Sequence, residues 1–208
     1  MILIGNKVGH FCCSMISFEL FLFYSWGFLL LITFFYRYHS CIYHLNVRTS
    51  IDASYYNRGL AKNGLKKYNE AILDYDRAIE LNSNYDDFYF SRGVSKDKLG
   101  KSQEAILDFD KTLELKPNCA EAYNNCGFSK NNLGKYEEAI LDYNKAIDLN
   151  SNNYHTYYNR GYLKHTLGRY NEAITDFNKV LSIEPNHVAA KENLELALSE
   201  LAKQQKKD

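Results

Sequence analysis

Four evenly spaced carboxylates are the first candidates for chemistry in this sequence. They recur at one constant interval and are Asp74, Asp108, Asp142 and Asp176. Two carboxylates held close together could act as an acid–base pair, because one can be protonated while the other stays charged. A fixed interval, however, places them in successive copies of one structural unit and not at one site. The spacing therefore favours a structural role, with a charged binding row as the alternative.

The histidines and cysteines do not have the spacing of a metal or catalytic site. His155 and His165 would lie about 15 Å apart along one helix, too far to bind one metal ion or to act as an acid–base pair. No cysteine pair has a C-x-x-C spacing, and no histidine lies at a zinc-ligand spacing from a cysteine. No nucleophile elbow, phosphate-binding loop or H-E-x-x-H motif occurs. The sequence predicts no enzymatic activity, no metal and no cofactor.

The charge balance argues against nucleic acid as a partner. Lys and Arg number 25, as do Asp and Glu, so the formal net charge is zero. Phosphate binding needs a basic excess or a clustered basic face. A protein or peptide partner is therefore expected.

The first segment, residues 1–51, differs sharply from the rest in composition. Residues 20–36 contain no charge and are mainly Phe, Leu and Ile, at the short end of a membrane-spanning helix. Two arginines, Arg37 and Arg48, follow this run, against Lys7 before it. This bias predicts a single-pass membrane protein whose remaining residues lie in the cytosol.

Three other interpretations of the hydrophobic segment remain open. A cleaved signal peptide fits less well, because no small-x-small cleavage site follows the apolar run. The segment could instead be a buried helix. If it is absent from the working protein, residues 52–208 would be a soluble cytoplasmic domain.

The rest of the chain is a sequence repeat, and its period is the interval that separates the four carboxylates. Four residue classes keep this register in every copy. The small residues are Gly59, Gly93, Gly127, Gly161 and Ala71, Ala105, Ala139, Ala173. The aromatic residues are Tyr55, Tyr89, Tyr123, Tyr157 and Tyr75, Phe109, Tyr143, Phe177. We expect four units, at 52–85, 86–119, 120–153 and 154–187.

Each unit contains two stretches with the apolar spacing of an amphipathic helix. In the third unit, Tyr136, Ala139, Ile140, Tyr143 and Ile147 recur at helical intervals. A Leu-Gly pair ends the first helix of units 2, 3 and 4, as glycine does at helix C-termini. In the first unit a lysine, at 66, stands where this glycine is expected.

This pattern resembles the tetratricopeptide repeat family, and it covers 136 of the 208 residues. The resemblance implies an all-α fold, a right-handed superhelical solenoid of helix-turn-helix repeats. Gly at repeat position 8 and Ala at position 20 then let the two helices approach closely. Residues 188–208 would form a capping helix and tail, with Val188, Leu194, Leu198 and Leu201 facing one way.

Repeat positions 7 and 23 should approach each other in the helical hairpin. Position 7 is arginine in three copies, Arg58, Arg92 and Arg160, and position 23 is always aspartate. We expect an ion pair between the two helices. Cys126 replaces the arginine in the third copy, so Asp142 should lack this partner.

The resemblance also implies that the inner face of the first helices binds the ligand. Repeat positions 2, 5, 6, 9, 12 and 13 would face this groove, and positions 5, 6 and 9 supply the candidate residues. They are Tyr56, Asn57, Leu60, Phe90, Val94, Asn124, Asn125, Phe128, Tyr158, Asn159 and Tyr162.

The asparagines at position 6, interrupted by Ser91, could bond the backbone of an extended peptide. That row is similar to the asparagine ladder in the tetratricopeptide domain of O-linked N-acetylglucosamine transferase. The alternatives are that these side chains are solvated or that they bond within the stack.

The carboxylate clamp that holds acidic chaperone tails in this family is not matched. At most one of its five positions agrees in either possible register, and the clamp's cations are absent. Chaperone C-terminal tails are therefore disfavoured. The sequence predicts a protein–protein interaction scaffold that binds an extended segment. A recognition or regulatory subunit of a separate enzyme, and a self-associating structural protein, are the alternatives.

Overall fold

The computed structural model of the chain describes residues 51–206. The predicted membrane span at residues 20–36 lies outside this range. Ile51–Asp208 form one compact unit. Among the helices of residues 51–206, none combines the length and the apolar character that crossing a membrane requires.

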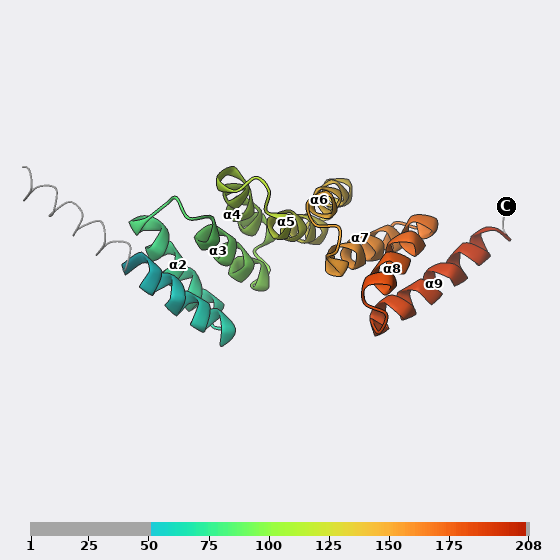
Figure 1. Cartoon of the computed structure of the whole chain (residues 1–208), viewed down its shortest axis with the longest axis horizontal. Coiled ribbons are helices and arrows are strands. Elements are labelled where there is room, and N and C mark those ends of the chain that lie inside the picture. Colours follow the sequence, from blue (N-terminus) through green and yellow to red (C-terminus); the bar gives the residue numbers. More distant parts are fainter. Residues whose placement is uncertain (1–50, 207–208) are drawn as a thin grey trace, which may run out of the picture. The chain divides into compact units, whose positions relative to one another are not determined.

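The described part of the chain is entirely helical (Figure 1). Residues 51–64 are helical and precede α2. The helices that follow are α2 (Tyr68–Leu81), α3 (Asp86–Lys98), α4 (Ser102–Leu115), α5 (Ala120–Asn132), α6 (Tyr136–Leu149), α7 (Tyr154–Thr166), α8 (Tyr170–Ile183) and α9 (Val188–Gln204). Because the connections are short, consecutive helices pack as antiparallel hairpins. The first helices of successive hairpins, α3, α5 and α7, begin at the repeat interval predicted from the sequence.

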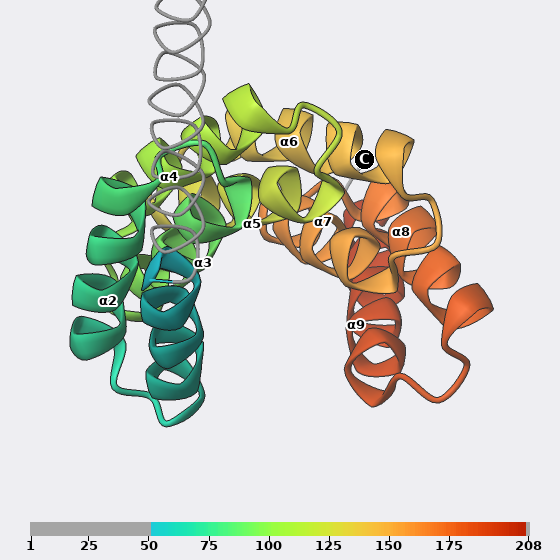
Figure 2. The same cartoon turned by 60° about the vertical axis from the view of Figure 1, so that its left-hand side comes forward.

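The hairpins stack into an arc with two layers (Figure 2). The even-numbered helices α2, α4, α6 and α8 form the outer layer. Residues 51–64 and helices α3, α5, α7 and α9 form the inner layer. Each helix packs mainly on its neighbours in the chain, as expected of a solenoid in which every repeat contacts only adjacent repeats.

Small residues at two positions let the helices of a hairpin approach each other. A Cβ atom added to Gly127 would lie 2.9 Å from Cε1 of Tyr143 and 3.0 Å from the carbonyl oxygen of Ala139. Ala139 is fully buried and Tyr143 is 1% exposed. The aromatic ring of the second helix therefore occupies the space that a side chain on the first helix would need.

The turn between the two helices uses a left-handed backbone conformation. Gly100, Gly134 and Gly168 have φ between 73° and 75°. In the first hairpin Lys66 takes this place, with φ of 59°. A lysine side chain disfavours that conformation by roughly 1–2 kcal/mol relative to glycine, so the first hairpin carries a small local strain.

The last helix, α9, packs on α8 through a face that differs in part from the predicted one. Val188 and Leu198 are 66% and 49% exposed, whereas Ala190 and Ala197 are fully buried. Ala197 packs with Ala173 and Phe177 of α8. The prediction was wrong for Val188 and Leu198, whereas Leu194 does pack against this cluster. It counted only the large apolar residues, while close approach between the two helices requires small ones.

The two buried alanines of α9 continue the repeat register. They occupy the positions that the buried side chains of Thr156 and Leu163 hold in α7. The last helix therefore packs on α8 like one more first helix of the stack.

Candidate functional site

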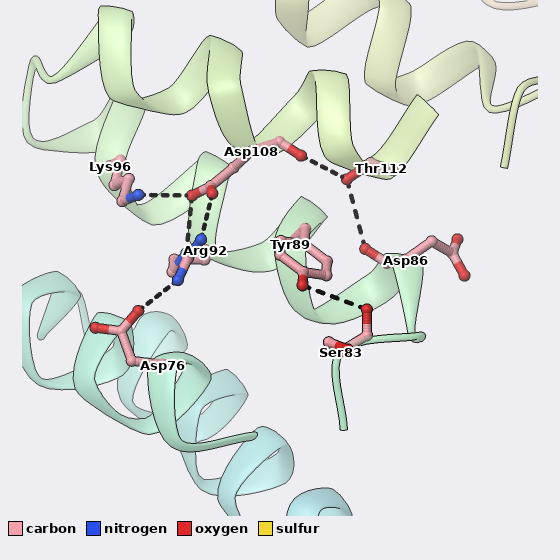
Figure 3. A network of polar contacts seen from close by, with 8 residues as sticks. All are labelled: Asp76, Ser83, Asp86, Tyr89, Arg92, Lys96, Asp108 and Thr112. Carbon is pink, nitrogen blue, oxygen red and sulfur yellow. Dashed lines mark hydrogen bonds and ion pairs between the residues drawn. The ribbon is translucent and has the colours of Figure 1, made fainter. Parts of the chain in front are cut away.

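A forked ion pair joins the two helices of the second hairpin (Figure 3). Arg92 donates from Nε and Nη2 to the two carboxylate oxygens of Asp108, at 2.9 and 2.5 Å. Its Nη1 donates to Asp76 in the preceding hairpin at 2.6 Å. Lys96 approaches Asp108 from the same helix, with Nζ 2.8 Å from Oδ2. The Asp108 side chain is only 4% exposed, so this charge is held by two cations inside the stack.

The first and fourth hairpins repeat this arrangement, which confirms the predicted pairing of positions 7 and 23. Arg58 donates twice to Asp74, and Arg160 donates twice to Asp176. A lysine at position 11 joins each pair, a contact that the sequence interpretation missed. The signal was present, since lysine recurs in the same register in every copy, as Lys62, Lys96, Lys130 and Lys164.

The third hairpin lacks the arginine, and its aspartate has a different environment. Cys126 lies where the arginine would be, with Sγ 3.7 Å from Oδ1 of Asp110. Lys130 is the ion-pair partner of Asp142, at 2.7 Å. The Arg58 guanidinium lowers the pKa of Asp74, whereas burial raises the pKa of Asp142 above its usual value. One cation therefore does not compensate the desolvation of this carboxylate.

The other titratable candidates are not arranged for catalysis. Burial raises the pKa of the Cys126 thiol to about 12, so the thiol stays protonated and is a poor nucleophile. The ring of His165 packs on Tyr170, while His155 is exposed and packs on Tyr154. Over residues 51–206, no group of three or more His, Cys, Asp or Glu side chains could hold a metal ion.

Hydrogen bonds across neighbouring hairpins engage several of the predicted groove residues. The Nδ2 atom of Asn159 donates to Oδ1 of Asn124 at 3.2 Å. Asn124 in turn donates to Asn125 at 3.4 Å. Similar pairs join the hydroxyls of Tyr56 and Ser91, and Asn193 with Tyr158. Part of this hydrogen-bonding capacity therefore holds the stack together.

A cleft of about 460 Å³ lies between the first helices of the third and fourth hairpins. Its lining comes from α5, α6 and α7. The lining residues are Phe128, Asn131, Asn132, Tyr143, Tyr158, Asn159 and Tyr162. Phe128 and Tyr162 remain 40% and 51% exposed. The rings of Tyr158 and Tyr162 are stacked, with centroids 6.4 Å apart and planes inclined by 26°. Aromatic surface is thus available to a ligand.

This cleft brings together four of the eleven predicted groove residues. They are Phe128, Tyr158, Asn159 and Tyr162. Asn124 and Asn125 are linked to it through the hydrogen bond to Asn159. The candidates of the first two hairpins do not line it; they are Tyr56, Asn57, Leu60, Phe90 and Val94.

The prediction missed Asn131, Asn132 and Tyr143 as lining residues. The two asparagines occupy repeat positions 12 and 13, one helical turn after Phe128. The resemblance already implied that these positions face the groove, but the residues there were not among the candidates. Tyr143 was assigned to the core, where it also belongs. Its ring is buried and packs with Leu163 of α7, and it also lines the cleft.

Known structures with the same fold include several tetratricopeptide repeat proteins. MamA has a TM-score of 0.69 and 23% identity, over 76% of this chain and 86% of that one. YrrB, described as a tetratricopeptide repeat protein with an unusual peptide-binding site, has a TM-score of 0.60 and 23% identity, over 70% and 75%. The first such domain of Spaghetti (RPAP3), bound to the HSP90 peptide SRMEEVD, has a TM-score of 0.55 and 29% identity, over 56% and 93%.

Comparisons of the sequence with curated proteins and with family models complement these structural similarities. No curated protein sequence matches it significantly. Models of the tetratricopeptide repeat match residues 53–85, 86–119 and 155–187, and a further one matches 130–168. These matches cover more than half of the chain. They agree with the stacked hairpins and with the buried glycine, alanine and aromatic positions. The chain therefore belongs to the tetratricopeptide repeat family.

Proposed function

We propose that this protein is an interaction scaffold, and that the cleft between α5 and α7 binds an extended segment of a partner protein. The observation that carries the proposal is the set of exposed aromatic rings in a concave site on the inner layer. Such rings supply contact area at a low cost in conformational entropy. The descriptions of YrrB and of the Spaghetti domain, both as peptide-binding proteins, support a peptide ligand for this fold.

The side chains around the rings suit a polypeptide main chain. Asn159 donates one of its two side-chain N–H groups to Asn124. Its other N–H group and its side-chain oxygen remain available to a ligand. Within residues 51–206, no side-chain hydrogen bond engages Asn131 or Asn132. An extended peptide presents unpaired N–H and C=O groups at short, regular intervals. The cleft can therefore combine burial of one side chain with hydrogen bonds to its neighbours' backbone.

Selection from a random peptide library tests this function. Phage displaying peptides of about twelve residues, about 40 Å when extended, are selected on the immobilised 208-residue chain. We expect Tyr162→Ala to raise the Kd of the selected peptides at least about tenfold, because an exposed aromatic contact is lost. Fluorescence anisotropy measures the Kd, and circular dichroism checks that the variant is folded.

Tyr136→Ala is the matched control for this experiment. Tyr136 begins α6, is 40% exposed and does not line the cleft. The Kd should stay unchanged in this variant. Equal losses in the two variants, or peptides that bind Tyr162→Ala as well as the unmodified chain, would contradict the assignment of the cleft.

A further inference from the structure

The cleft between α5 and α7 is uncharged throughout its lining. All seven lining residues are Phe, Tyr or Asn, and none of these carries a charge near neutral pH. In the preceding interval of the stack, repeat positions 12 and 13 are occupied by Asp97 and Lys98. In this interval the same positions are Asn131 and Asn132. The absence of charge is therefore a property of this place and not of the whole inner face.

Three cations on the two inner helices that flank the cleft already form ion pairs with carboxylates. Arg160 and Lys164 both bind Asp176, and Lys130 binds Asp142. The side chains of these three cations are between 10% and 19% exposed. A charged group of either sign that enters the cleft would lose hydration without meeting an oppositely charged lining residue.

An apolar side chain, in contrast, gains from the same surroundings. It would cover the exposed faces of Phe128 and Tyr162, which removes apolar surface from water on both partners. Tyr162 is supported from behind by Tyr158, whose ring also packs on Phe177. The ring is therefore held in place before a ligand arrives, which reduces the entropy lost on binding.

From this geometry we infer that the cleft selects an uncharged extended segment with one aromatic or bulky aliphatic side chain at its centre. Acidic and basic segments are rejected at this place. The inference rests on the proposed peptide-binding function and specifies its ligand class. It separates this site from one suited to the peptide SRMEEVD, whose sequence carries three acidic residues.

The test uses one peptide from the library selection, resynthesised with Asp or Lys in place of its central residue. On the full chain, we expect either substitution to raise the Kd at least about tenfold. We also expect the Kd of the original peptide to change less than about twofold between about 50 and about 500 mM NaCl, because no ion pair contributes.

A variant of one cleft residue serves as a control in which the affinity for a charged peptide should rise and not fall. Asn132 is exposed at the end of α5, so Asn132→Lys should be tolerated. This variant should bind the Asp-substituted peptide more tightly than the unmodified chain does.

Two outcomes would overturn the inference, and they are distinguishable from each other. Selected peptides that are acidic, with a Kd rising more than about tenfold over the same salt range, would refute the ligand class and leave peptide binding intact. If no peptide prefers the unmodified chain over Tyr162→Ala, the proposed function fails, and the inference fails with it.

Discussion

Asp108→Asn is expected to lower the free energy of unfolding by about 3 kcal/mol, the usual loss when one partner of a buried ion pair is removed. Asparagine keeps the size of the side chain but cannot accept both arms of Arg92 and the ammonium of Lys96. Urea denaturation of the full chain, followed by circular dichroism, measures the loss.

Asp142→Asn is the matched variant in the third hairpin, and we expect it to lower the free energy of unfolding by less than Asp108→Asn does, because one cation and not two loses its partner. Within residues 51–206 its carboxylate forms an ion pair with Lys130 alone, and burial raises its pKa. A carboxyl group whose pKa is higher in the folded than in the unfolded state destabilises the fold at neutral pH, and this penalty disappears as the pH falls through the folded-state pKa. Equal losses in the two variants would show that the forked arginine contact adds nothing.

Gly127→Ala is expected to lower the free energy of unfolding by about 2 kcal/mol, because the added methyl group overfills a packed interface. Its Cβ would lie 2.9 Å from the Tyr143 ring and 3.0 Å from a backbone oxygen of α6. The backbone oxygen cannot move without displacing the helix. Since Tyr143 also lines the cleft, the same variant should weaken peptide binding.

Gly64→Ala should have the opposite effect on stability. Gly64 is also helical, but a Cβ there would meet no atom within 4 Å. Alanine is favoured over glycine in a helix by roughly 0.5–1 kcal/mol. The same urea experiment should therefore show a gain for Gly64→Ala and a loss for Gly127→Ala. Effects of the same sign would contradict the close packing described for Gly127.

The constant interval between similar residues was sufficient to predict most of the stack. It located the buried glycines and alanines, the aromatic rings behind them, and the pairing of Arg92 with Asp108. These features recur because the two helices of each hairpin pack against each other in the same way. A recurring residue type in register therefore has a direct physical meaning, even without knowledge of the three-dimensional fold.

Contacts between successive hairpins were harder to predict. The bond from Arg92 to Asp76 crosses between units, and nothing within one repeat indicates which residues meet there. The buried alanines of α9 were missed because a small residue contributes little to an apolar pattern. The cleft itself depends on how far neighbouring inner helices separate, and spacing along the chain does not determine that distance.

Mapping where a bound peptide lies tests the central claim most directly. A selected peptide carries a benzophenone at its central residue, is bound to the full chain and is crosslinked by light. Mass spectrometry then identifies the attached residues. We predict attachment on α5 and α7, around Phe128 and Tyr162, and loss of the product with excess unlabelled peptide. Attachment to the outer helices, around Leu73, Leu107 or Leu141, would contradict the assignment of the inner cleft as the binding site.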